Sequence, residues 1–291
     1  MQINHTRARI AAKKLLGDTN QLLITLLIGV EGVRTGKVVK DESFKVSWNP
    51  KDLNSTSQRA RRFARAAALS WAVDALDAYL GDLADRSIYD LSQLSIPLND
   101  QLTNRSIFVK LNSITSAIAL PIGFELSLVH LAIQWRNNLI HFHAENELEK
   151  QYETFIKNNL ISDESNPNKF GNLSGRDLIE EFNDGKHPKF KGVAAFIKSI
   201  NTLIEVLDAA VAQKITVPAY VKGLLTDSVK QKDGKASFSR IWGEPIKEKR
   251  MRSISSLLNS LGVGVNSLDP DFMFLSEMSV RQMQQYLSLT D

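Results

Sequence analysis

Residues 124–135 of the chain read FELSLVHLAIQW, a stretch without glycine or proline. Its large apolar side chains recur at spacings of three and four, at Phe124, Leu128, Leu131 and Trp135. This spacing places them in one stripe along an amphipathic helix. Strand signals are few elsewhere in the chain, so other helices are expected to cover that stripe. The sequence therefore predicts an all-α fold.

Six further segments have helical apolar patterns or helix-end signals. They cover residues 7–30, 58–85, 101–119, 190–214, 251–261 and 277–288. The helix that contains residues 124–135 is expected to run from 122 to at least 146, with 159 as its furthest end. Alternation at residues 44–48 predicts a short strand or an extended arm.

Changes in composition divide the chain into three regions. Residues 1–57 are predicted to form an N-terminal helix and a polar arm, 58–160 a helical core, and 161–291 a C-terminal helical region. The polar segment 163–175 contains a proline and two glycines and is the best linker candidate.

The composition excludes several chemistries. The chain has 291 residues, 43% hydrophobic content and no cysteine, which excludes disulfides, thiolate zinc sites and a cysteine nucleophile and fits a cytoplasmic protein. A net charge of +4 is compatible with a nucleic-acid partner. The apolar run Leu22–Val30 spans nine residues, about half of a bilayer crossing, so we expect a buried helix and no membrane partner.

The sequence Arg-Asn-Asn-Leu-Ile-His-Phe-His at residues 136–143 carries the strongest chemical signal. An arginine binds phosphate through a planar fork of donors. A histidine exchanges a proton near neutral pH without special tuning. Arg136 with His141 or His143 is therefore a minimal set for cleaving a phosphodiester without a metal or cofactor.

Helix geometry complicates the pairing of these residues. At about 100° per residue, Arg136 and His141 would point about 140° apart on an unbroken helix, whereas His143 would lie within about 20° of the arginine. Either the helix bends or ends near Asn137 and Asn138, or two chains share the site. Both histidines stay candidates.

The pattern of Arg136, Asn137 and His141 after a long apolar helix resembles the signature of the HEPN family (higher eukaryotes and prokaryotes nucleotide-binding domain). The resemblance covers about residues 58–159. It implies a helical bundle that dimerises so that both motifs line one cleft, and a metal-independent endoribonuclease. It further implies a toxin or antiviral abortive-infection effector, held in check by an antitoxin or another regulatory partner.

The resemblance also implies roles for individual residues. Arg136 would hold the scissile phosphate, and Asn137 would contact the phosphate or fix the arginine. His141 would act as general base or general acid, with His143 as the second candidate. An acidic residue on a neighbouring helix would orient the arginine, and Asp74 and Asp77 are the candidates.

A basic cluster at the start of the helix predicted at 58–85 is a candidate RNA-backbone patch, or simply a solvated helix start. Its members are Arg59, Arg61, Arg62 and Arg65. His130 lies within the apolar stripe and is expected to be a core or interface residue.

Two other readings of the motif stay open. One is a catalytically silent helical module that binds a nucleotide, RNA or a partner protein. The other is a metal-dependent nuclease that uses His141, His143, Glu145 and Glu147, which would require a broken helix because alternate residues on a helix point apart. We expect no metal.

Overall fold

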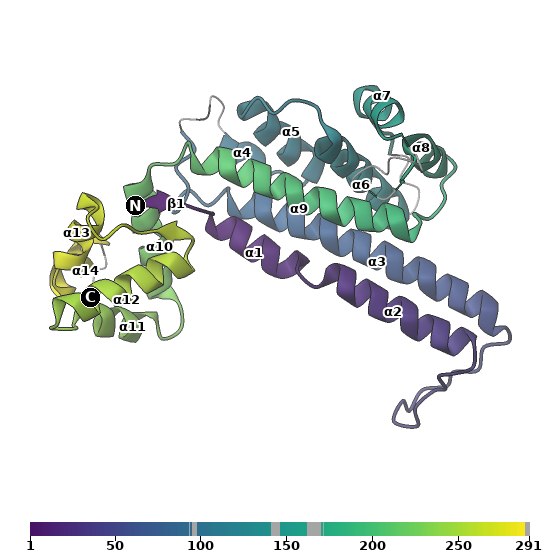
Figure 1. The fold of residues 1–291 in the computed structure, drawn as a ribbon, viewed down its shortest axis with the longest axis horizontal. Helices are drawn as coiled ribbons and strands as arrows, with labels where there is room; N and C mark the ends of the chain where they lie inside the picture. Colours follow the sequence, from purple (N-terminus) through teal and green to yellow (C-terminus); the bar gives the residue numbers. More distant parts are fainter. Residues whose placement is uncertain (93, 95–97, 141–145, 162–169, 171, 289–291) are drawn as a thin grey trace. The chain divides into compact units, whose positions relative to one another are not determined.

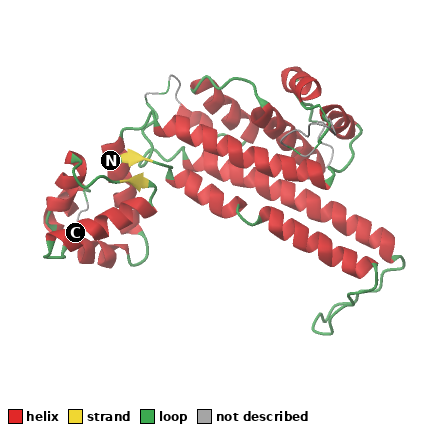
Figure 2. Cartoon of the chain, in the orientation of Figure 1, coloured by secondary structure: helices red, strands yellow, loops and turns green. Residues whose placement is uncertain are grey.

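The computed structural model describes residues 1–92, 94, 98–140, 146–161, 170 and 172–288. Most of these residues are helical and almost none are in strands, which confirms the all-α fold (Figure 2). Their strand content is one short antiparallel pair, β1 (Gln2–Ile3) with β2 (Val263–Gly264), in which Gln2 faces Gly264 and Ile3 faces Val263.

The helices follow one another along the whole chain (Figure 1). They are α1 (Arg7–Leu16), α2 (Thr19–Arg34), α3 (Leu53–Asp82), α4 (Leu98–Leu102), α5 (Ile107–Ala117), α6 (Phe124–Ile140), α7 (Lys150–Asn159), α8 (Gly175–Asn183), α9 (Phe190–Ala212), α10 (Val217–Lys230), α11 (Gly234–Trp242), α12 (Lys247–Ser260), α13 (Pro270–Glu277) and α14 (Val280–Tyr286).

The chain divides into two compact units, each assembled from segments that are distant in sequence. The motif unit comprises Ala12–Asp77 and Pro121–Ile204. The terminal unit comprises Met1–Ala11, Ala78–Leu120 and Glu205–Asp291. These units do not coincide with the three consecutive regions suggested by composition.

In the motif unit, α6 is the central helix, and every residue from Leu126 to Trp135 is buried. The indole of Trp135 packs edge-on against Phe182 and Phe196, and its Nε1–H donates to the carbonyl of Lys186 at 2.9 Å. Helix α7 packs against α6, and α8 packs against α7. The apolar stripe thus lies where the sequence predicted it, inside a layer of helices.

The single helix expected at residues 7–30 is two helices, α1 and α2, separated at Gly17 and Asp18. The Nε1–H of Trp71, on α3, donates to the carbonyl of Leu15 at 2.8 Å. That carbonyl lies in the last turn of α1, where helix carbonyls lack a partner within the helix. A tertiary hydrogen bond therefore satisfies the helix end.

The helix expected to run to residue 146 or beyond is described as far as Ile140, and Asn146 is not helical, so that expectation was wrong. Residues 146–149 are not helical, and α7 begins only at Lys150. Asn138 supplies a physical reason, because its side chain hydrogen-bonds the backbone of Asn146. Such side-chain bonding competes with the helix.

Other boundaries differ for local reasons. The segment expected as one helix at 101–119 is α4 followed by α5, and Ser106 caps α5 by accepting from the amide of Val109. Pro218 lies in the first turn of α10, where proline is tolerated. Helices α8, α10, α11 and α13 were not expected.

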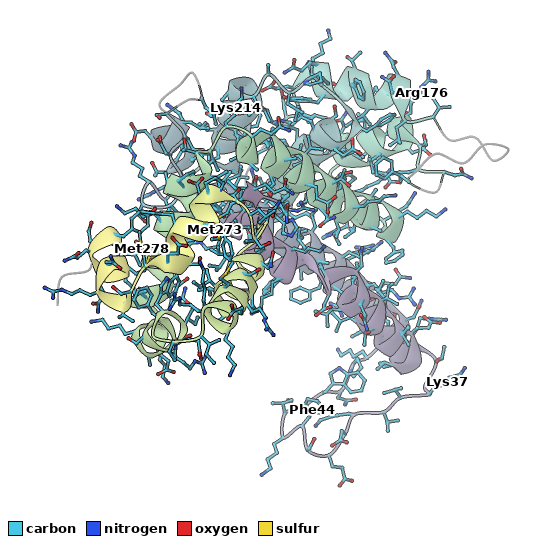
Figure 3. All side chains as sticks on the ribbon, turned by 60° about the vertical axis from the view of Figure 1, so that its left-hand side comes forward. Lys37, Phe44, Arg176, Lys214, Met273 and Met278 are labelled. Atoms are coloured by element: carbon cyan, nitrogen blue, oxygen red, sulfur yellow. The ribbon has the colours of Figure 1, made fainter. Side chains whose placement is uncertain are left out.

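The segment between α2 and α3 contains no strand, so of the two alternatives for residues 44–48 only the irregular arm is found. Phe44 and Lys37 lie on this arm (Figure 3). No helix among the described residues is long and apolar enough to cross a membrane.

The terminal unit is organised around the N-terminal segment. Asp208 is buried and accepts hydrogen bonds from both the amide and the hydroxyl of Thr6. The hydroxyls of Tyr220 and Tyr89 accept from the amides of Arg7 and Ala8 at 2.7 and 2.9 Å. These bonds satisfy the first amides of α1, which have no partner within the helix.

Candidate active site around Arg136

Arg136 lies one turn before the end of α6, and its side chain is 19% exposed. Its Nη2–H donates to Oδ1 of Asp74 at 2.8 Å, and its Nη1–H donates to Oδ1 of Asn137 at 3.2 Å. Asp74 comes from α3, so two helices of the motif unit fix the guanidinium. A guanidinium has five N–H donors, and these two contacts leave others for a further acceptor.

The Asp74–Arg136 ion pair acts more on orientation than on stability. The Asp74 side chain is 57% exposed, and exposed pairs of this kind contribute about 1 kcal/mol or less. The Nε–H of Arg136 is buried and has no hydrogen-bond partner among the described residues. The arginine is therefore held at its tip.

The two acidic candidates differ in their contacts. Asp74 contacts Arg136 directly. Asp77 lies three residues further along the same helix and is half-buried. The structure thus joins Asp74 to the arginine, while the orienting role suggested for either carboxylate stays a prediction.

The two candidate histidines, His141 and His143, lie outside the described residues, as does Glu145. The residues on either side of them are described and are tied together. Oδ1 of Asn138 accepts from the amide of Asn146 at 2.9 Å, and Nδ2 of Asn138 donates to the carbonyl of Asn146 at 3.1 Å. Asn138 was not among the predicted site residues.

This pairing imitates one step of a β-ladder, in which a backbone exchanges both its donor and its acceptor. It holds the last turn of α6 close to Asn146, so the residues before and after the histidine-bearing segment are connected. The only signal for it in the sequence is the Asn137-Asn138 doublet directly after the arginine.

A pocket of about 550 Å³ opens beside the end of α6, within the motif unit. It is lined by Trp135, Asn138, Leu139, Asn146, Glu147, Leu148, Glu153, Ile179, Phe182, Asn183, Gly185 and Lys186. A lining that combines apolar side chains with amide and charged groups is usual for small-molecule sites. Its volume is in the range of such sites, and Asn138 links it to the motif.

Three of the four arginines in the predicted RNA-backbone patch share a second pocket of about 490 Å³ in the same unit. Arg61, Arg62 and Arg65 line it, whereas Arg59 does not. Arg59 is exposed and donates to the hydroxyl of Thr56 at 3.4 Å. The structure therefore separates Arg59 from the other three.

His130 is a core residue. It is fully buried and stacks on Tyr152 with ring centroids 4.0 Å apart. Burial lowers its pKa to about 3, so the imidazole stays neutral at physiological pH. It is thus unsuited to acid–base exchange near neutrality. Among the described residues, no three histidine, aspartate or glutamate side chains gather as metal ligands would.

Comparison with known protein families, with curated proteins and with solved structures finds no match to this chain.

Proposed function

We propose that this protein is a metal-independent endoribonuclease of the HEPN type, built around Arg136. The observation that carries the proposal is the fixation of Arg136 by Asp74 and Asn137 at the end of an apolar helix, directly before two histidines. An arginine held at its tip, with N–H groups to spare, is prepared to bind a phosphate oxygen without reorganising.

The reaction uses the ribose 2′-hydroxyl as the nucleophile. His141, or His143 in its place, accepts the proton of that hydroxyl, and the 2′-oxygen attacks phosphorus. Arg136 offsets the negative charge that grows on the non-bridging oxygens. The bond from phosphorus to the 5′-oxygen breaks, and the leaving oxygen takes a proton from the imidazolium of a second motif. The products are a 2′,3′-cyclic phosphate and a 5′-hydroxyl.

A homodimer with a composite site is part of the proposal. Helix α2 carries large apolar side chains that are exposed within the motif unit, with Leu22 at 60% and Ile28 at 68%. Phe63 and Trp71 on α3 are exposed as well. Large exposed apolar groups on two helices are suited to a protein contact, and a second copy of the chain would cover them.

The biological role in the proposal is that of a toxin or an antiviral abortive-infection effector in the cytoplasm. Uncontrolled cleavage of RNA would harm the cell, so an antitoxin or another regulatory partner is included. Arg59, Arg61, Arg62 and Arg65 supply positive charge for the RNA backbone.

The decisive experiment incubates the purified protein with total RNA and with tRNA, in EDTA, and maps the ends of the fragments. Wild-type protein is expected to produce 2′,3′-cyclic phosphate ends. Arg136→Lys, which keeps the charge but loses the planar fork, is expected to lose cleavage while its helical circular dichroism and its oligomeric state are unchanged.

His141→Ala and His143→Ala decide which histidine is essential, and unchanged cleavage in both variants would overturn the mechanism. Loss of cleavage in EDTA would point instead to a metal-dependent nuclease. No cleavage by the wild-type protein at any concentration would favour the silent binding module, for which the pocket beside Asn138 offers a site.

A further inference from the structure

The pocket lined by Arg61, Arg62 and Arg65 has features that a solvated helix start does not need. Its other lining residues are Leu27 from α2, Gln58 from α3 and Phe190 from the start of α9. The pocket therefore collects three arginines from one helix together with apolar side chains from two others.

The positive charge in this pocket is only partly balanced. Glu31 pairs with Arg61 and also with Arg34. In the part of the chain that the structure describes, no carboxylate lies within ion-pair distance of Arg62 or Arg65. Two guanidinium groups thus face one cavity without a direct counter-charge.

This excess of positive charge affects the pKa values of neighbouring groups. Burial, and then the charges of Arg62 and Arg61, lower the pKa of Arg65, against a smaller opposing effect of Glu181. Burial, and then the charges of Arg62 and Arg65, lower the pKa of His187. Like charges held together and partly desolvated cost free energy, which a bound anion offsets.

One of these arginines also has a donor to spare. The Nε–H of Arg61 is buried and lacks a hydrogen-bond partner among the described residues. Guanidinium groups bind phosphate oxygens in a bidentate manner. A phosphate monoester carries about −1.5 to −2 at pH 7, which suits several arginines better than the single charge of a diester.

The apolar lining residues of the pocket favour an apolar group on the same ligand. Phe190 is 37% exposed and lines both this pocket and a mostly apolar groove, whose other lining residues are Ile24, Leu27, Ile28 and Glu31. An exposed aromatic ring beside a phosphate site is suited to stacking on a flat ring such as a base.

We infer that this pocket binds a phosphate monoester that bears a planar ring, with the phosphate on Arg61, Arg62 and Arg65 and the ring against Phe190. A free mononucleotide and the 5′-phosphorylated end of an RNA share this chemistry. The inference does not depend on RNA cleavage, and it excludes Arg59 from the site.

The test is isothermal titration of the full chain with phenyl phosphate, inorganic phosphate and phenol. Phenyl phosphate is expected to bind one site per chain at least 10-fold more tightly than inorganic phosphate, and phenol is expected not to bind. Equal affinities for phenyl phosphate and inorganic phosphate, or no binding of either, would overturn the inference.

Variants locate the site. Arg62→Gln and Arg65→Gln should each weaken the binding of phenyl phosphate at least 10-fold. Arg59→Gln removes the same charge from the same helix and should leave the binding unchanged. Phe190→Ala should lower the affinity for phenyl phosphate to that for inorganic phosphate. An equal loss in Arg59→Gln would show diffuse attraction rather than a site.

Two further arms separate this pocket from the proposed active site and identify the source of the phosphate. Arg136→Gln should bind phenyl phosphate as tightly as the wild-type protein does. A loss of binding in this variant would overturn the inference. Uridine monophosphate and a 5′-phosphorylated oligouridine are compared with their dephosphorylated forms. The ligand that binds more tightly of these two identifies the source of the phosphate. If removing the phosphate does not weaken the binding of either ligand, the inference is contradicted.

Discussion

Oδ1 of Asp74 lies 2.8 Å from Nη2 of Arg136, although 62 residues separate the two in the chain. Asp74 lies on α3 and Arg136 on α6, and α4 and α5 come between these two helices in the chain. The carboxylate is more exposed than the arginine that it holds. An exposed acid that fixes a mostly buried arginine is better suited to positioning than to stability.

Asp74→Asn is therefore expected to lower RNA cleavage about 100-fold, because a displaced guanidinium no longer meets the scissile phosphate. The melting temperature should change little, since the pair contributes about 1 kcal/mol or less. Gel-based cleavage kinetics and thermal melting measure both effects. Asp77→Asn is the matched comparison, and a larger loss of cleavage there would assign the positioning role to Asp77.

Asn138→Ala is expected to release the segment that follows α6. It removes both hydrogen bonds to the backbone of Asn146, with a local cost of about 1–3 kcal/mol. Hydrogen exchange at the amide of Asn146 should become faster, and RNA cleavage should fall. Asn137→Ala removes only the contact to Nη1 of Arg136, so it should leave that amide protected. Unchanged exchange in Asn138→Ala would contradict the connecting role of Asn138.

His130 should make the protein less stable in acid. Its folded-state pKa is lowered to about 3 from 6.5, so the unfolded chain binds a proton that the folded chain does not between these values. The free energy of unfolding therefore falls as pH drops below 6.5, by about 2 kcal/mol at pH 5 from this residue.

His130→Phe keeps an aromatic ring against Tyr152 and removes the titration. Denaturant unfolding at pH 7.5 and pH 5 should show a smaller loss of stability in the variant than in the wild-type protein. Parallel losses in the two proteins would show that His130 is not the group responsible.

Thr6→Val should destabilise the terminal unit by about 1–3 kcal/mol, because it removes a donor from the buried carboxylate of Asp208. Burial already raises the pKa of Asp208, and the hydrogen bonds from Thr6 oppose that shift. The variant should raise this pKa further. The free energy of unfolding of the variant then falls furthest below that of the wild-type protein at neutral pH. The difference shrinks as the pH falls toward 3.8 and Asp208 is protonated.

Thr6→Ser retains the hydroxyl and serves as the control for the removal of the donor. Thermal melting of the three proteins at pH 7 and pH 4.5 tests the expectation. A deficit in Thr6→Val that grows in acid would contradict the role given to Asp208.

The fold class was predictable because it depends on local spacing. The intervals of three and four in residues 124–135 mark a helix wherever it packs, and α9 lies within two residues of its expected range at both ends. The ends of α1 and α6 were not predictable, because the bonds that set them come from Trp71 and Asn146, outside those helices.

The site was predictable only as far as residue type allows. Periodicity placed Asp74 and Asp77 on one helix face without choosing between them, and the contact of Asp74 with Arg136 is a matter of packing. No pattern joins Leu27 and Phe190 to the arginine cluster, because the pocket is formed by three separate helices.

The interleaving of the two units has a consequence for synthesis on the ribosome. The motif unit draws on residues up to Ile204, and the terminal unit begins at Met1 yet needs residues beyond Glu205. A nascent chain therefore emerges with Arg136 well before the motif unit has all of its parts, because that unit is complete only once Ile204 has been added. By the same reasoning, a fragment limited to residues 58–160 would lack pieces of both units and is a poor choice for expression.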